Sequence, residues 1–122
     1  MAALVSKSFD APDEVRSPDK TKVEMVDLGS VKVGRLRAEA GWRWSECIKP
    51  VVGGDSCQAH HVGVLISGTM HVVHDGGEET DLTAGSAYVI EPGHDAWVVG
   101  DEPVIAYEFD TATAESFARP SS

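Results

Sequence analysis

Apolar and polar residues alternate along most of this chain in short runs. Clear examples are residues 31–37, Val-Lys-Val-Gly-Arg-Leu-Arg, and residues 42–46, Trp-Arg-Trp-Ser-Glu. Such alternation is typical of strands that bury one face. Turn residues separate the runs, and Asp75-Gly76-Gly77 in particular suits a tight hairpin. Because strand follows strand with almost no helical period, the pattern predicts an all-β sandwich or barrel of antiparallel strands.

The predicted strands occupy one continuous region of the chain. They are expected at residues 23–28, 31–37, 42–46, 58–66, 70–74, 78–82, 88–90, 96–99 and 104–109. The polar residues 1–21, which include Pro12 and Pro18, are expected to form an N-terminal arm. We therefore predict one barrel over residues 22–110. A C-terminal tail over 111–122 follows, and a helical period occurs only at 112–118.

Length, composition and charge narrow the class of protein. The chain has 122 residues, of which 42% are hydrophobic, and this suits a single core. Its net charge is -10, so its surface should repel phosphate backbones and anionic lipids, and we expect neither nucleic acid nor a membrane as a partner. The N-terminal apolar run is too short for a signal peptide, and no stretch is long enough to span a membrane, so a cytoplasmic location is expected.

The two cysteines, Cys47 and Cys57, are expected to be free thiols in a reducing compartment. Strand parity supports this expectation. If residues 42–46 form a strand, Trp42, Trp44 and Glu46 share one of its faces and Cys47 lies on the other. An inward-pointing Cys57 would then be badly placed to form a disulfide with it.

Two segments, residues 55–68 and 85–97, each combine a strand-like apolar run with glycines and with cysteine or histidine. Together they resemble the two half-motifs of the cupin family, small β-barrels that often hold one metal ion. Gly68, Gly85 and Gly93 match the glycine positions of these motifs. The resemblance covers residues 30–110 and implies an all-β, single-domain cupin barrel of the jelly-roll type.

The chain departs from the cupin motifs at the positions of the family's metal ligands. Asp55, Cys57 and His61 stand where the first motif has its two histidines and its glutamate. Ala96 stands at the histidine position of the second motif, and His94 lies two residues before it. The resemblance therefore implies the fold more strongly than it implies a particular ligand set.

The residues at these positions still permit a metal site. Asp55, Cys57 and His61 share one face if the segment is an extended strand. If His94 enters the same cavity, a thiolate and two imidazoles converge on Cys57, His61 and His94. Such a set suits zinc best among divalent metals, with nickel and copper as alternatives. In the competing interpretation, Cys57 is a small buried hydrophobe and His61 a hydrogen-bonded pocket residue.

A ligand pocket is expected next to these residues, with Asp55, Trp44, Glu46 and Tyr107 in its wall. Trp42 and Trp44 share a face of the predicted strand, where they either line a pocket for an organic ligand or fill the core or a dimer contact. Glu46 and Tyr107 are polar groups that could orient a ligand.

The resemblance implies a small-molecule-binding barrel, with or without a bound metal. The first alternative is a metal-dependent enzyme of the oxygenase, isomerase or lyase type, and the second is a non-catalytic sensor or interaction module. The fold alone does not choose among them. Exposed strand edges near residues 22–37, together with the way related cupins pair, imply a homodimer.

Overall fold

The computed structural model describes residues 3–109. The tail that we expected over 111–122 lies outside the described residues. The elements are β1 (Glu14–Arg16), β2 (Thr21–Asp27), β3 (Lys32–Ala38), α1 (Trp44–Cys47), α2 (Lys49–Val52), β4 (His61–Ser67), β5 (Thr69–His74), β6 (Glu79–Thr83), β7 (Ala87–Ile90), β8 (His94–Val98) and β9 (Val104–Glu108). The chain is mostly strand, so the prediction of an all-β fold is confirmed.

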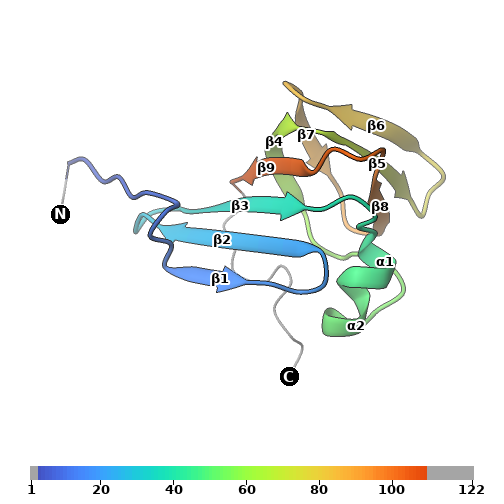
Figure 1. Ribbon diagram of the computed structural model, residues 1–122, viewed down its shortest axis with the longest axis horizontal. Coiled ribbons are helices and arrows are strands. Elements are labelled where there is room, and N and C mark those ends of the chain that lie inside the picture. The colour runs from blue at the N-terminus through green and yellow to red at the C-terminus, as the bar shows by residue number, and fades with distance from the viewer. Residues whose placement is uncertain (1–2, 110–122) are drawn as a thin grey trace.

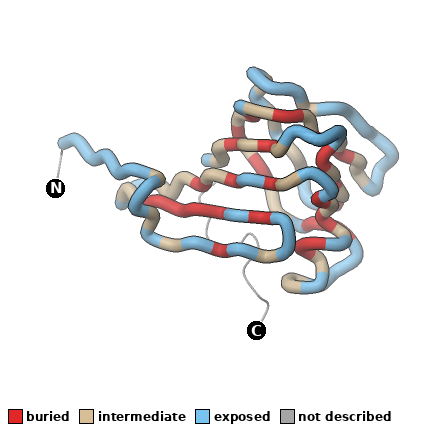
Figure 2. Tube along the Cα trace, in the orientation of Figure 1, coloured by how far each residue is buried: buried red, intermediate tan, exposed pale blue. Residues whose placement is uncertain are grey.

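The strands form two antiparallel sheets (Figure 1). One has the order β1-β2-β3-β9-β4-β7, and the other has the order β6-β5-β8. The hydrophobic core takes Leu65 and Ala106 from the first sheet and Val72 and Ala96 from the second, so it lies between them. Buried residues recur along the strands of both sheets (Figure 2). This is the two-layer arrangement expected of a jelly roll.

Part of the expected N-terminal arm is attached to the larger sheet. Residues Glu14–Arg16 form β1, which pairs with β2. Nearby, Phe9 packs on Tyr107 with ring centroids 5.4 Å apart. At this end of the sheet the edge strand is therefore β1, and not the strands near 22–37 whose exposed edges motivated the prediction of a homodimer. The homodimer itself stays a prediction.

The prediction of a strand at residues 42–46 is wrong, because α1 begins at Trp44. The chain is extended through Arg43 (φ -143°, ψ 134°) and then enters α1 at Trp44. A tertiary contact favours the turn, because the Asp95 carboxylate accepts a hydrogen bond from the Ser45 N–H at 3.1 Å. Alternation over five residues does not distinguish a strand from one helical turn, because a tertiary contact of this kind can determine which of the two forms.

The helix changes which side chains of this segment are buried. Trp44 and Cys47 are three residues apart and therefore share one helix face, and both are buried. Cys47 thus faces inward, contrary to the strand parity, and Glu46 is exposed. The expectation of free thiols is nevertheless confirmed for Cys47 and Cys57.

Gly68 closes the turn between β4 and β5 in a place where no side chain fits. Its φ is +81°, and an added Cβ would lie 2.6 Å from the Pro103 carbonyl oxygen. We expect Gly68→Ala to lower the free energy of unfolding by about 3 kcal/mol, through backbone strain and this clash. Gly29→Ala is the control, because Gly29 has φ +92° but an added Cβ would meet nothing within 4 Å. Equal losses in urea denaturation would show that the clash contributes nothing.

No helix among residues 3–109 is long and apolar enough to cross a membrane.

Candidate metal centre

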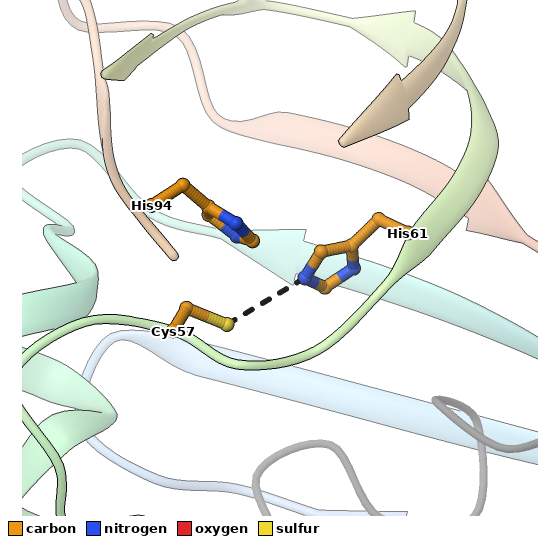
Figure 3. Close-up of side chains that lie close together, drawn as sticks. All are labelled: Cys57, His61 and His94. Atoms are coloured by element: carbon orange, nitrogen blue, oxygen red, sulfur yellow. Dashed lines mark hydrogen bonds between the residues drawn. The ribbon is translucent and has the colours of Figure 1, made fainter. Parts of the chain in front are cut away.

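Cys57, His61 and His94 converge inside the barrel (Figure 3). His61 and His94 are the first residues of β4 and β8, and Cys57 lies in the loop before β4. Their possible ligand atoms all lie within 4.8 Å of one another. The Cys57 Sγ is 3.7 Å from the His61 Nε2, and the two imidazole centroids are 5.1 Å apart. All three side chains are buried, with at most 5% exposed.

Main-chain hydrogen bonds hold Cys57 against His94. The Cys57 N–H donates to the His94 carbonyl at 2.7 Å, and the Cys57 carbonyl accepts from the N–H groups of Gly93 and His94 at 2.7 and 3.2 Å. The Ser56 hydroxyl also donates to Asp75 at 2.7 Å, and the Asp75 N–H donates to the Gly93 carbonyl at 2.7 Å. The loops that carry the two ligands are therefore tied together.

A carboxylate that sequence reasoning missed, Glu108, supports His61. Its Oε1 lies 2.6 Å from the His61 Nδ1, and its Oε2 accepts a hydrogen bond from the Tyr88 hydroxyl at 2.6 Å. The alternation in β9 could have indicated that Glu108 points inward, because Glu108 has the same strand parity as the buried Val104 and Ala106. Tyr107, which we expect from the sequence in the pocket wall, has the opposite strand parity to these buried residues.

The structure does not bring the expected pocket residues Asp55, Glu46 and Tyr107 to the cluster. Asp55 is exposed because residues 53–60 form a loop and β4 begins only at His61, so the two-residue parity does not extend back to it. Glu46 is exposed on α1, and the ring of Tyr107 packs on Phe9. Trp44 does face the interior, where it belongs to the same buried core as Cys57.

The Nδ1 atom of each histidine faces an oxygen acceptor outside the cluster. The Nδ1 atom of His61 faces the Glu108 carboxylate, and that of His94 lies 2.8 Å from the Glu91 carbonyl. Both acceptors require Nδ1–H, so the neutral form of each ring has its lone pair on Nε2. This is how metal-binding histidines are commonly oriented.

Charges inside the cluster favour a thiolate. Burial raises the pKa of Cys57. Hydrogen bonds from His61 and His94, and the charges of these rings, lower it by more than burial raises it, so the pKa is about 6. Burial lowers the pKa of His61, whereas the charge of Glu108 and hydrogen bonds to Cys57 and Glu108 raise it to about 10. Burial and Glu108 both raise the pKa of Tyr88. These shifts favour a thiolate–imidazolium pair next to the Glu108 carboxylate.

We expect the Cys57 thiolate of the metal-free protein to form with a midpoint near pH 6 and not near 9.0, the ordinary thiol value. The difference in ultraviolet absorbance between the protein and Cys57→Ala, followed against pH, measures this. Glu108→Gln should move the midpoint upward, because the imidazolium loses its counter-charge. A midpoint near the ordinary value in the unmodified protein would contradict the ion pair.

The same pair should give stability an unusual pH dependence. The lowered pKa of Cys57 makes stability rise with pH between about 6 and 9. The raised pKa of His61 makes it fall between 6.5 and about 10. The two slopes cancel from 6.5 to 9, so this pair contributes a plateau there and a decline above it. Urea denaturation of the protein and of Cys57→Ala at several pH values measures the contribution.

A cavity of about 270 Å³ lies between the β5–β6 hairpin and β7. Its wall includes the apolar Val72, Leu82 and Ile90. Ile90 is the cross-strand partner of His61, and such partners have neighbouring side chains. Because β6 and β7 are edge strands of different sheets, no ladder of hydrogen bonds closes the gap between them.

No family model matches the sequence, and no curated protein matches it. Solved structures do match. A protein of unknown function from Rhizobium leguminosarum is 17% identical, with a TM-score of 0.61 over 88% of this chain and 97% of that chain. An RmlC-like cupin from Shewanella frigidimarina is 19% identical, with a TM-score of 0.54 over 80% of this chain and 83% of that chain.

An oxalate decarboxylase from Lactobacillus farciminis, solved as a formate complex, is 14% identical, with a TM-score of 0.64 over 91% of this chain. The match covers 34% of the decarboxylase. At such identities the likeness shows the fold alone. The chain therefore has the cupin fold, as the glycine spacing implied.

Proposed function

We propose that this cupin-fold chain binds a small molecule at one divalent metal ion held by Cys57, His61 and His94. The observation that carries the proposal is the convergence of three buried ligand atoms, from one thiol and two imidazoles, within 4.8 Å of one another. In a tetrahedral zinc site, sulfur and nitrogen ligands lie about 3.6 Å apart. The 3.7 Å between the Cys57 Sγ and the His61 Nε2 is close to that value. All donor pairs lie within 4.8 Å, so a shift of roughly 1 Å would complete such a site.

Zinc fits the donor set best. One thiolate and two imidazoles suit its borderline-soft character, and nickel and copper bind similar donors. Binding would displace the proton that His61 carries in the metal-free cluster. Glu108 and the Glu91 carbonyl would keep the two imidazoles in place, as supporting groups do in zinc proteins.

An open coordination position supports small-molecule binding. Sites with three protein ligands commonly leave a fourth position for water or substrate, whereas structural zinc sites use four protein ligands. The cavity lined by Ile90, the cross-strand partner of His61, offers space for a ligand of modest size. The cupin fold also supports a barrel that encloses one small ligand.

A metal-dependent enzyme is the second candidate, and Glu108 favours it. Glu108 hydrogen-bonds to both His61 and Tyr88. A metal would supply a Lewis acid. The carboxylate and the phenol would hold or accept protons beside it. The reaction could be of the oxygenase, isomerase or lyase type.

Metal analysis of protein purified without an affinity tag tests the proposal. We expect one equivalent of zinc, or of another divalent metal, that a strong chelator removes and added zinc restores. Replacement by cobalt(II) should produce a thiolate-to-metal charge-transfer band that reports the Cys57 ligand. Protein that takes up no stoichiometric metal after incubation with zinc, nickel or copper would contradict the proposal.

A further inference from the structure

Two buried hydrogen-bond donors of the barrel have no acceptor in the part of the chain that the structure describes. The indole N–H groups of Trp42 and Trp44 are without a partner among the described residues, although the two residues are only 3% and 2% exposed. An unpaired buried donor costs about 1–3 kcal/mol, and folded proteins seldom leave one so. Two of them, two residues apart, indicate that an acceptor comes from outside the described residues 3–109.

The backbone directs both indoles into the barrel. The Trp42 carbonyl accepts a hydrogen bond from the Val98 N–H of β8 at 3.0 Å. The backbone of Arg43 pairs with that of Trp97 in an isolated antiparallel β-bridge. The Arg43 guanidinium lies 4.2 Å from the centre of the Trp97 ring, and Trp97 alternates with the buried residues of β8, so this pair is on the outer face. Because Arg43 is extended, its neighbours Trp42 and Trp44 project to the inner face.

The inner face of β8 is also the face of the metal cluster. It carries His94, Ala96 and Val98, which are buried. Trp42, Trp44 and Cys57 belong to one hydrophobic core. The unpaired donors and the proposed metal ligands therefore share the barrel interior.

We infer that the barrel interior binds an oxo compound, a small molecule whose carboxylate or carbonyl oxygen accepts hydrogen bonds from the indole N–H groups of Trp42 and Trp44. An indole N–H only donates, so the end of the ligand that it meets must be an acceptor, which excludes an ammonium group. The inference deepens the proposed function and rests on it for the idea that a ligand enters the barrel.

The rest of such a ligand would meet apolar surface. Val72 belongs to the same core as the two tryptophans and also lines the cavity between the β5–β6 hairpin and β7, as do Leu82 and Ile90. On β8, Ala96 is the cross-strand partner of Val72. An apolar body attached to the oxo group fits this surface.

The NMR resonances of the indole N–H groups test the inference directly. Acetate, acetamide and ethylammonium are matched probes, small enough for any site that holds a larger oxo compound. We expect acetate or acetamide, at millimolar concentration, to shift the Trp42 and Trp44 resonances downfield and to leave Trp97 unchanged. Ethylammonium should move neither. Acetate and acetamide distinguish a carboxylate from a neutral carbonyl ligand.

Single substitutions identify the donors. Trp44→Phe and Trp42→Phe should each weaken binding of the active probe about tenfold, since each removes one hydrogen bond to it. Trp97→Phe, which removes an indole from the outer face, should bind the probe normally. If one inner variant fails to fold, the other variant and the shifts in the unmodified protein still decide the matter.

Two results would overturn the inference. One is that neither acetate nor acetamide moves the two resonances, as when ordered water already satisfies the donors. The other is that ethylammonium moves them equally. Metal-free and zinc-treated protein should be titrated in parallel. Probe binding at the indoles without zinc uptake contradicts only the proposed function, whereas zinc uptake with unmoved indole resonances contradicts only the inference.

Discussion

Replacing Cys57 with alanine is expected to lower zinc affinity by about a thousandfold. The thiolate is the one anionic ligand of the proposed site, and metal-binding free energy in such sites comes largely from deprotonated ligands that are already in place. The main-chain hydrogen bonds between Cys57 and His94 do not involve the side chain, so the loop should keep its position. Competition with a chromophoric chelator measures the affinity.

Cys47→Ala is the matched control for this variant. Cys47 is as buried as Cys57, at 3% exposed, but its sulfur lies near Asp19, at 3.9 Å from Oδ2. It should bind zinc as the unmodified protein does. Zinc affinity that is the same in Cys57→Ala and Cys47→Ala would exclude thiolate ligation.

Removal of the Glu108 carboxylate should have the second largest effect. Glu108→Ala leaves the His61 Nδ1–H and the Tyr88 hydroxyl without their acceptor, and we expect zinc affinity to fall by about tenfold to a hundredfold, as when other supporting groups of metal sites are lost. The free energy of unfolding should also fall, by about 3 kcal/mol, because two buried donors lose their partner. Chelator competition and urea denaturation measure the two quantities.

Two variants separate the support of the metal from simple packing. Glu108→Gln keeps the shape and can still accept from His61 through its carbonyl oxygen, so it should lose less zinc affinity than Glu108→Ala. Tyr88→Phe removes one hydrogen bond and keeps the carboxylate on His61, so it should bind zinc nearly normally. If Tyr88→Phe and Glu108→Ala weaken zinc binding equally, the role of Glu108 is packing and not orientation of His61.

Local patterns were sufficient to predict an all-β fold of antiparallel strands, and the resemblance to the two cupin half-motifs implied the cupin barrel. Alternation in β3 and β5 and the hairpin at Asp75-Gly76-Gly77 depend on neighbours in the sequence, which is why they could be interpreted without tertiary information. The glycine at 68 is required by a positive φ and a close approach to Pro103, so its spacing carried real information about the turn. The same local reasoning failed at residues 42–46, where a contact from Asp95, far away in the sequence, starts a helix.

The candidate site divides in a similar way. The residue types alone indicated Cys57, His61 and His94 as candidate ligands, because thiol and imidazole side chains are the usual ligands of zinc. Their convergence was decided by tertiary structure, since Cys57 is positioned by pairing with His94 and not by a strand of its own. For the same reason, strand parity wrongly assigned Asp55 to the pocket.

By itself, the sequence determined most of the strands, with buried faces such as that of β3, and the chemistry of the three candidate ligands, since these follow from the period of each segment and the nature of each side chain. Only the tertiary structure decided that β9 delivers Glu108 to His61 and that β8 turns Trp42 and Trp44 inward. These contacts join residues far apart in the chain through pairing between strands. No local pattern specifies which strands become neighbours.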